Sequence, residues 1–239
     1  MTRPLYLEDA YRTEADAVVT GLTSEGALIV DASVFYPTGG GQPGDSGEIA
    51  WDSGRLAIAT AVKTEDGQIA LVPSEPATAP VPGTAITQRI DPARRLGHMR
   101  MHTALHLLSV VIPLPVSGGA VGAGKSRLDF NMAEPPEDKA ALEAALNALV
   151  ARDLPVTESW ITDAELRANP GLVKTMSVAP PAGQGRVRLV RIGAGDDQVD
   201  LQPCGGTHVA RTGEIGRLRL GKIEKKGRQN RRVYVHLET

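Results

Sequence analysis

Short apolar segments separated by turn residues dominate the first third of the chain. Five of them lie between residues 16 and 72, with Gly or Asp-Gly between neighbours: DAVVTGL, GALIVDASVFY, GEIAW, RLAIATAV and QIALV. Apolar segments of this length without a helical period are typical of antiparallel strands. Their close spacing predicts a small N-terminal antiparallel β-barrel.

The pattern changes after a proline-rich segment. Residues 73–84, PSEPATAPVPGT, contain four prolines and no apolar period, as expected of a stiff linker or of a loop beside a strand. We place a domain boundary close to residue 85. Residues 1–88 are assigned to the barrel and residues 89–239 to a second domain.

Helical periods appear from residue 92 onward. Asp91-Pro92 is a helix start signal, and apolar residues at spacings of three and six predict one amphipathic helix over 92–112. A second helix is expected after the Pro-Pro pair at 135–136 and a short third between Thr162 and Asn169. Strand-like runs also occur here: RLDFNM, VRLVRIG, QVDLQ, IGRLRL and RRVYVHLE. Helices and strands do not simply alternate, which predicts an α+β fold.

Composition narrows the class of protein. Hydrophobic residues make up 41% and charged residues 23% of the 239 residues, as in a folded globular protein. No apolar run approaches the roughly 18 residues of a membrane span, and the N-terminus lacks the apolar stretch of a signal peptide. We therefore expect a cytoplasmic protein without a membrane partner. Aromatic residues are only 3%, which disfavours a surface that stacks many bases.

The net charge of −2 conceals an asymmetry. Residues 186–239 contain 12 Lys and Arg against 6 Asp and Glu, whereas residues 1–185 contain 14 against 22. The densest basic segment is GKIEKKGRQNRR, and such a cluster can contact nucleic-acid phosphates. A solvated hairpin loop is the alternative interpretation.

Two compact pairs of soft ligands lie about a hundred residues apart. His102 and His106 are four residues apart on the predicted first helix, so both imidazoles can reach one ion. His98, one turn earlier, could belong to the same exposed stripe. Cys204, the single cysteine, and His208 flank a Gly-rich turn after a predicted strand. Three His and one Cys are a zinc ligand set. A purely structural zinc site and a cysteine nucleophile with a histidine base are the alternatives.

The pairing of HTALHLL with CGGTHV resembles the editing domain of alanyl-tRNA synthetase and its free-standing relatives, the AlaX alanyl-tRNA editing proteins. The likeness extends to five further segments: FYPTGGGQPGDSGEI at 35–49, RLDF at 127–130, VRLVRIG at 187–193, QPCGGTHVARTGEIG at 202–216 and KIEKKGRQNRRV at 222–233. Motif order and length resemble the medium-sized AlaX class. This resemblance implies a barrel joined to a zinc-bearing α+β editing domain, with one Zn²⁺ held by His102, His106, Cys204 and His208.

The activity implied by the resemblance is hydrolysis of a wrong amino acid, chiefly serine and secondarily glycine, from alanine tRNA. A synthetic pocket sized for alanine rejects serine poorly, so a second, hydrolytic site must add discrimination. Because no tRNA-binding domain is evident in the 239 residues, we expect recognition of the acceptor stem and 3′ end. Leu105 stands where the synthetase version commonly has a small polar residue.

Four residues are candidates for binding the substrate: Gln42, Thr103, Gly40 and Gly41. By resemblance, the glycine-rich motif contributes to discrimination between serine and alanine. Thr103 could instead bond back to its own helix. Gly40 and Gly41 could be required only for a turn.

Residues 119–126, GAVGAGKS, satisfy the P-loop pattern but precede a predicted strand instead of a helix, so we predict no nucleotide triphosphate ligand. Five basic residues are candidates for phosphate contacts with tRNA: Lys125, Arg127, Arg228, Arg231 and Arg232. Two other functions are compatible with these residues, a threonyl-tRNA-type editing deacylase and a non-catalytic zinc-stabilised RNA-binding module.

Overall fold

The structure is a computed structural model that describes residues 1–76, 78–174 and 185–238. The chain divides into two compact units, Met1–Leu96 and Gly97–Thr239. The division falls eight residues later than the predicted boundary at 88/89, which would cut through a strand at Ala85–Ile90. Among the described residues, no helix has the length and apolar character needed to cross a membrane.

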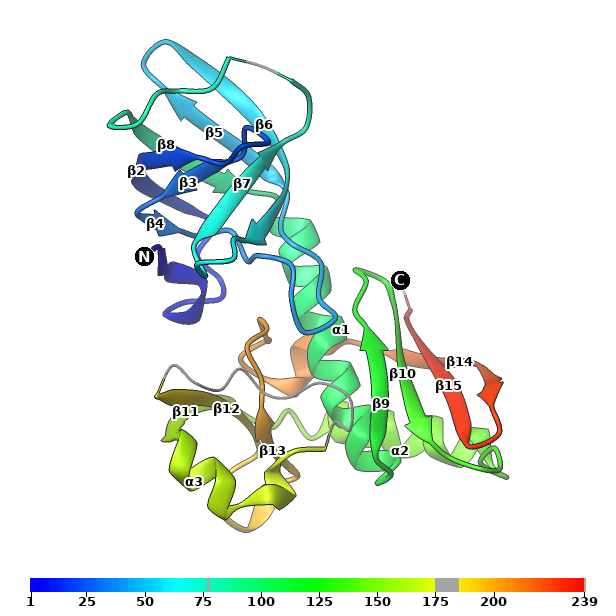
Figure 1. Ribbon diagram of the computed structural model, residues 1–239. Coiled ribbons are helices and arrows are strands. Elements are labelled where there is room, and N and C mark those ends of the chain that lie inside the picture. The colour runs from blue at the N-terminus through cyan, green and yellow to red at the C-terminus, as the bar shows by residue number, and fades with distance from the viewer. Residues whose placement is uncertain (77, 175–184, 239) are drawn as a thin grey trace. The chain divides into compact units, whose positions relative to one another are not determined.

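The first unit contains a closed antiparallel barrel in the order β2-β3-β7-β6-β5-β8 (Figure 1). The barrel strands are β2 (Glu14–Leu22), β3 (Leu28–Val30), β5 (Gly47–Trp51), β6 (Gly54–Lys63), β7 (Ile69–Pro73) and β8 (Ala85–Ile90). Two short strands, β1 (Arg3–Pro4) and β4 (Ala32–Ser33), pair in parallel beside it. Alternate residues of β2 are buried, as expected of a strand with one face on a core. The predicted barrel is confirmed.

The proline-rich segment lies inside the barrel sequence. It connects β7 to β8, and β8 closes the barrel by pairing with both β2 and β5. Of the two predicted interpretations, the loop beside a strand is correct and the linker between domains is wrong. The closing strand could not be assigned from the local pattern because its partners are distant in sequence.

The first predicted helix is α1 (Pro92–Val111). It begins as predicted, since the Asp91 carboxylate accepts the Arg94 backbone N–H at 3.0 Å. Its surroundings differ from those predicted for an amphipathic helix, because all described side chains from Gly97 to Ser109 except Arg100 are buried. His98 is buried too, so the exposed histidine stripe is wrong.

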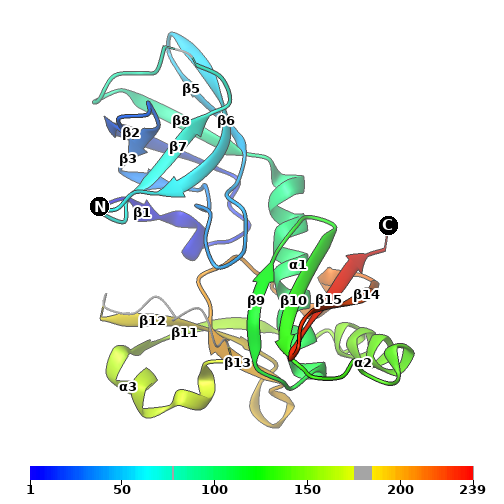
Figure 2. The same ribbon diagram turned by 45° about the vertical axis from the view of Figure 1, so that its right-hand side comes forward.

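The second unit places sheets beside α1. Figure 1 shows a four-stranded sheet on one side of α1 and a three-stranded sheet on the other. Figure 2 shows the larger sheet with its strands side by side in the order β14-β15-β10-β9. The strands are β9 (Val116–Ala120), β10 (Lys125–Asn131), β14 (Leu218–Gly227) and β15 (Asn230–Leu237); the smaller sheet contains β11 (Val156–Thr162), β12 (Arg186–Ile192) and β13 (Asp200–Pro203).

The remaining helices match the predictions. They are α2 (Lys139–Ala151) and α3 (Asp163–Ala168), and α3 begins with a capping box between Thr162 and Glu165. Short 3-10 helices cover Leu5–Leu7, Pro170–Leu172, Gly195–Asp197 and Thr212–Ile215. The barrel, the helices and the two antiparallel sheets together make the chain α+β, as predicted.

The segment with the P-loop pattern connects β9 to β10 and opens no helix. A Cβ added at Gly97 of α1 would lie 2.9 Å from Ala123 in this connection, so helix and loop approach closely. The Ser126 hydroxyl accepts the Gly122 backbone N–H at 3.1 Å. The lysine and serine of the pattern therefore belong to a β-hairpin, where no helix N-terminus faces a phosphate.

Candidate metal centre

Helix α1 presents two imidazoles on one face. His102 and His106 lie one turn apart, with ring centroids separated by 5.5 Å. The ring of His208 lies 4.5 Å from that of His102 and 4.6 Å from that of His106. Three histidines from two distant segments therefore form one cluster.

Cys204 completes this cluster. It follows β13, and its Sγ lies 3.2 Å from His208 Nε2 and 3.6 Å from His102 Nε2. One ligand atom from each of the four residues lies within 4.8 Å of all the others. The structure thus brings together the two pairs that sequence spacing singled out.

Thr103 holds His208. The Thr103 hydroxyl donates to the Met99 carbonyl at 2.9 Å, so its oxygen accepts from His208 Nδ1 at 3.1 Å and from the Val209 backbone N–H at 3.3 Å. One donor and two acceptor positions are the full capacity of a hydroxyl. The alternative bond of Thr103 to its own helix is confirmed, and its contact with substrate stays a prediction. With Nδ1 donating, His208 presents its Nε2 lone pair to the cluster.

His106 is held by residues that the sequence did not single out. Its Nδ1 donates to Asp200 Oδ2 at 2.9 Å, and Lys174 donates to the other oxygen of this buried carboxylate. Gln202 Nε2 donates to Asp200 Oδ2 at 2.8 Å. A carboxylate behind a histidine fixes the ring orientation and the tautomer. The spacing of Asp200 and Gln202 before Cys204 carried no separate signal.

The charges around the cluster are strongly coupled. Burial raises the pKa of the Cys204 thiol, but interactions with His102 and His208 outweigh burial and hold that pKa well below its usual value. Burial lowers the pKa of His106, yet hydrogen bonds with Asp200 and Cys204 raise it to about 9. Burial is the main cause that brings the pKa of His208 to about 3. A thiolate and a neutral imidazole, the forms that bind metal, are thus favoured at Cys204 and His208.

Arg188 on β12 supports the loop that carries Cys204. The side chain is buried, and its Nη1 donates to the carbonyl oxygens of Cys204 and Gly206 at 2.9 and 2.8 Å. Its Nε donates to Glu158 Oε2 at 2.8 Å, and Nη2 donates to the other carboxylate oxygen. The Arg188 carbonyl also accepts the Cys204 N–H at 3.1 Å. Sequence reasoning missed Arg188 because its targets are main-chain atoms.

The donor set fits zinc. Tetrahedral zinc with bonds of about 2.0–2.1 Å to nitrogen and about 2.3 Å to sulfur separates its ligand atoms by roughly 3.3–3.6 Å. The distances from Cys204 Sγ to Nε2 of His208 and of His102, 3.2 and 3.6 Å, are close to this spacing. Thr103 and Asp200 each orient one imidazole from behind, as is usual for metal-bound histidines. His102, His106, Cys204 and His208 would hold the ion.

The predicted glycine-rich motif lies in the first unit. Gly39 and Gln42 exchange backbone hydrogen bonds at 3.0 and 2.9 Å, with Gly40 and Gly41 between them at φ of 57° and 79°. Positive φ at both central residues is typical of a type I′ turn, which favours glycine at these positions. The turn requirement of Gly40 and Gly41 is confirmed. Gln42 is fully buried, and its contact with substrate stays a prediction.

The predicted phosphate contacts lie on or beside the four-stranded sheet. Lys125 and Arg127 are on β10, Arg232 is on β15, and Arg228 lies exposed in the turn between β14 and β15. Arg231 is buried and donates to the backbone carbonyls of Gly227, Asn230 and Ala133. Its guanidinium therefore holds the main chain in this structure, and its contact with tRNA stays a prediction.

Comparison with known proteins places this cluster in a family. Residues 187–234 match the family described as threonyl and alanyl tRNA synthetase second additional domain, and residues 9–94 match tRNA synthetases class II (A). The chain is 32% identical over 247 residues to the alanyl-tRNA editing protein AlaX-M of Methanosarcina acetivorans, with 99% of both chains covered. The chain belongs to the AlaX-M family. AlaX-M of Methanosarcina barkeri is 33% identical over 245 residues, again with 99% of both chains covered.

The AlaX-M family shares this region with a larger protein. The alanine–tRNA ligase of Caldivirga maquilingensis is 36% identical over 235 residues, which are 94% of this chain and 25% of the ligase. The chain thus spans about a quarter of that relative. Cys204 and His208 lie within the match to the second additional domain, whereas His102 and His106 lie between the two matched ranges.

Proposed function

We propose that this protein is a zinc-dependent aminoacyl-tRNA deacylase that removes serine, and secondarily glycine, from alanine tRNA. Membership of the AlaX-M family supports an editing role in trans. The cluster of His102, His106, Cys204 and His208 carries the zinc part of the proposal, because its four ligand atoms lie within 4.8 Å of one another. We expect the protein to act in the cytoplasm, where charged tRNA is used.

Discrimination is the purpose of such a hydrolase. Serine exceeds alanine by one hydroxyl, which a pocket sized for alanine rejects only weakly. A second site that hydrogen-bonds the hydroxyl disfavours alanine, because its polar groups would then be left unpaired. Gln42 and the backbone at Gly40 and Gly41 are the proposed contacts. Thr103 is a further proposed contact, and its hydroxyl would exchange one of its present partners for the substrate.

The roles of the cluster residues follow from their chemistry. When bound, zinc supplies Lewis-acid polarisation of an ester carbonyl or lowers the pKa of a water molecule. Cys204 serves as a ligand, and an engaged thiolate is a poor nucleophile, so we do not assign it covalent catalysis. Thr103 and Asp200 hold His208 and His106 in the tautomers that point Nε2 at the cluster. No general base is assigned.

Deacylation assays test this proposal directly. Seryl-, glycyl- and alanyl-tRNA for alanine are each incubated with the wild type, His106→Ala and Cys204→Ala, and bound metal is quantified in each preparation. His98→Gln is the matched control, because His98 is a buried histidine of the same helix outside the cluster. We expect serine ester to be hydrolysed by the wild type and the control only.

Three results would contradict the proposal in different ways. Hydrolysis of serine ester that survives chelation removes the zinc requirement. Equal hydrolysis of alanine ester removes the proofreading role. Tight binding of tRNA with the ester left intact replaces the enzyme by an RNA-binding module.

A further inference from the structure

Strand register gathers charged side chains on one face of the four-stranded sheet. Side chains alternate along a strand, so Lys125, Arg127 and Asp129 of β10 share a face. The residues directly opposite them on β15 are His236, Tyr234 and Arg232. Directly opposed residues of an antiparallel pair lie on the same face. Arg219 and Glu224 of β14 extend this face, since they lie opposite His236 and Arg232.

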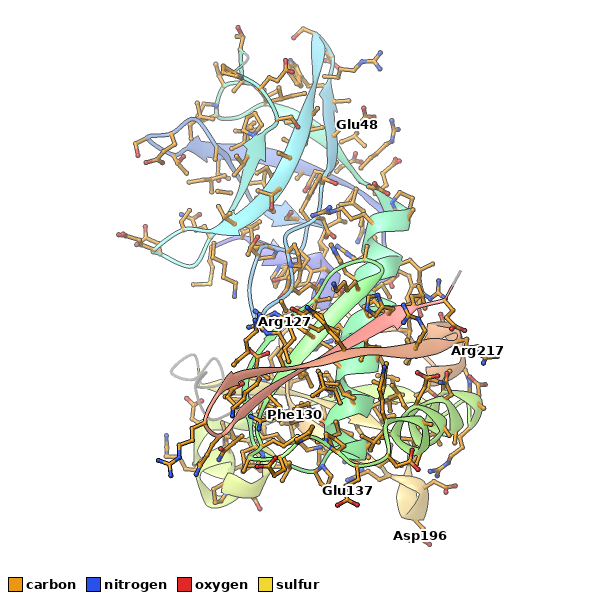
Figure 3. The ribbon with its side chains drawn as sticks, turned by 90° about the vertical axis from the view of Figure 1, so that its right-hand side faces the viewer. Glu48, Arg127, Phe130, Glu137, Asp196 and Arg217 are labelled. Atoms are coloured by element: carbon orange, nitrogen blue, oxygen red, sulfur yellow. The ribbon has the colours of Figure 1, made fainter. Side chains whose placement is uncertain are left out.

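The other face of the same strands is apolar and packed. Leu128 lies opposite Val233, and Phe130 follows on β10; all three are buried. Figure 3 labels Arg127 and Phe130, which belong to the two opposite faces of β10. The charged face is therefore the one that this sheet does not use for its core.

Two arginines on this face are pre-ordered by one carboxylate. Arg232 donates to both oxygens of Asp129 at 2.8 and 2.9 Å, and Arg127 donates to the same carboxylate at 2.7 Å. Burial raises the pKa of Asp129, but these hydrogen bonds outweigh it and keep the group ionised. The carboxylate engages only part of the five N–H donors on each guanidinium. Both side chains are thus held in place with donors left for a further anion.

The third cation is ordered differently. The Lys125 ammonium lies 4.5 Å from the centre of the Tyr234 ring, and the Tyr234 hydroxyl donates to Glu224 at 3.2 Å. Glu224 also pairs with Lys222 and Lys226. Because lysine covers the ring, Tyr234 positions a cation here instead of offering a surface for a base.

The charge of this face is clearly positive. Among the described residues it carries Arg219, Lys222, Lys226, Lys125, Arg127 and Arg232 against Asp129 and Glu224, a net charge of +4. Burial and the cations Arg219 and Lys125 lower the pKa of His236, which keeps it neutral. We call these nine residues together with Tyr234 the basic face.

Two glycines lie among the side chains of the basic face. A Cβ added at Gly221 would lie 2.8 Å from the Tyr234 Cβ and 2.7 Å from His236 Nε2, which places Gly221 between these side chains. A Cβ at Gly118 would lie 3.5 Å from Asp129 Oδ2. Glycine at 221 thus leaves room for Tyr234 and His236 to lie over this strand, and the part-exposed Gly118 has no side chain that would shield Asp129 and its two arginines.

We propose that the basic face binds the sugar-phosphate backbone of the double-stranded acceptor stem of tRNA. The inference rests on the proposed function, which supplies the RNA. Charge complementarity selects a polyanion, and the ordered cations favour backbone contacts over base readout. Duplex RNA is recognised mainly through its shape, phosphates and 2′-hydroxyls, which suits a sheet face without an open aromatic platform.

The test measures binding of an uncharged acceptor-stem hairpin by fluorescence anisotropy between 50 and 300 mM salt. The variants are Lys125→Gln, Arg127→Gln and their combination, with Arg167→Gln on α3 as a matched exposed control outside the face. Each lost phosphate contact should lower the affinity about fivefold at 0.15 M salt and reduce the salt slope by about 0.7–0.9. Glu224→Gln removes a negative charge and should strengthen binding.

Deacylation of full-length seryl-tRNA separates this inference from the proposed function. The double variant should raise KM by at least tenfold and lower kcat much less. If the double variant deacylates seryl-tRNA with the KM of the wild type and binds the hairpin with the same salt slope, RNA binding by the basic face is overturned and the proposed deacylase function stands. If hairpin binding depends on Lys125 and Arg127 but the wild type deacylates no tRNA, RNA binding by the basic face is supported and the proposed deacylase function is overturned. Equal weakening by Arg167→Gln also overturns the face.

Discussion

Replacing Arg188 by methionine should loosen the loop that carries Cys204 and weaken metal binding while the second unit stays folded. Arg188 is 5% exposed and is the donor to the carbonyl oxygens of Cys204 and Gly206 at 2.9 and 2.8 Å. Methionine fills most of the space of the arginine stem but donates no hydrogen bond. The perturbation therefore removes support from the main chain around one metal ligand.

The magnitude follows from the groups left without a donor. A buried carbonyl that loses its partner costs about 1–3 kcal/mol, so the buried Gly206 carbonyl and the part-buried Cys204 carbonyl together set an upper limit of about 6 kcal/mol. Glu158 is 36% exposed and can be solvated, so it adds little to this cost. The loop should relax so that its carbonyls reach water, which lowers the loss of stability but moves Cys204 away from its position in the cluster. Loss of such supporting contacts typically weakens metal affinity by about 10–100-fold.

Titration with Co²⁺ reports on this loop directly, because thiolate coordination produces a charge-transfer absorption that depends on the position of Cys204. Arg186→Met is the matched control, since Arg186 is an exposed arginine of the same strand that stacks on Trp160. Arg188→Lys, which retains one cationic donor, should lie between the wild type and Arg188→Met. Wild-type Co²⁺ affinity and absorption in Arg188→Met would refute the reasoning.

Three further predictions concern the same protein. Thr103→Val leaves the buried donors of His208 and Val209 unpaired and should lower metal affinity at least tenfold, whereas Thr103→Ser should remain close to wild type in the same titration. Because the pKa of His106 is raised to about 9 and its proton must leave on coordination, Zn²⁺ affinity should rise about tenfold per pH unit between pH 6.5 and 8.5; a flat profile contradicts this. Asp45→Asn removes one partner of the buried pair with Arg95 and should destabilise the first unit by about 3–5 kcal/mol in denaturant unfolding, and a loss below 1 kcal/mol contradicts it.

Local signals predicted the elements whose causes are local. Helix α1 starts where Asp91 caps it and Pro92 supplies a fixed φ, and α3 starts with the capping box at Thr162. The type I′ turn at Gly40 and Gly41 likewise depends on neighbouring residues alone. Such features are encoded within a few positions of the chain.

Elements that depend on distant partners were missed or misjudged. Strand β9 contains two adjacent glycines, and β11 is largely exposed, so neither has a clear apolar alternation. Each is a strand because a neighbour pairs with it, β10 in one case and β12 in the other. The burial of α1 on most sides follows from two sheets, and five of their seven strands begin at residue 156 or later. The spacing of apolar residues within the helix cannot show that a second sheet also packs against it.

The metal cluster divides along the same line. Residue type and spacing were enough to choose His102, His106, Cys204 and His208, since these are four of only six His and Cys residues and form two pairs with a spacing of four residues. The partners that orient them were not evident, because Asp200 reaches His106 across 94 residues and Arg188 acts on backbone carbonyls. Whether a side chain can bind a metal depends on its residue type, which can be read directly from the sequence. The residues that hold these ligands by hydrogen bonds depend on which segments lie side by side, and only the tertiary structure decides that.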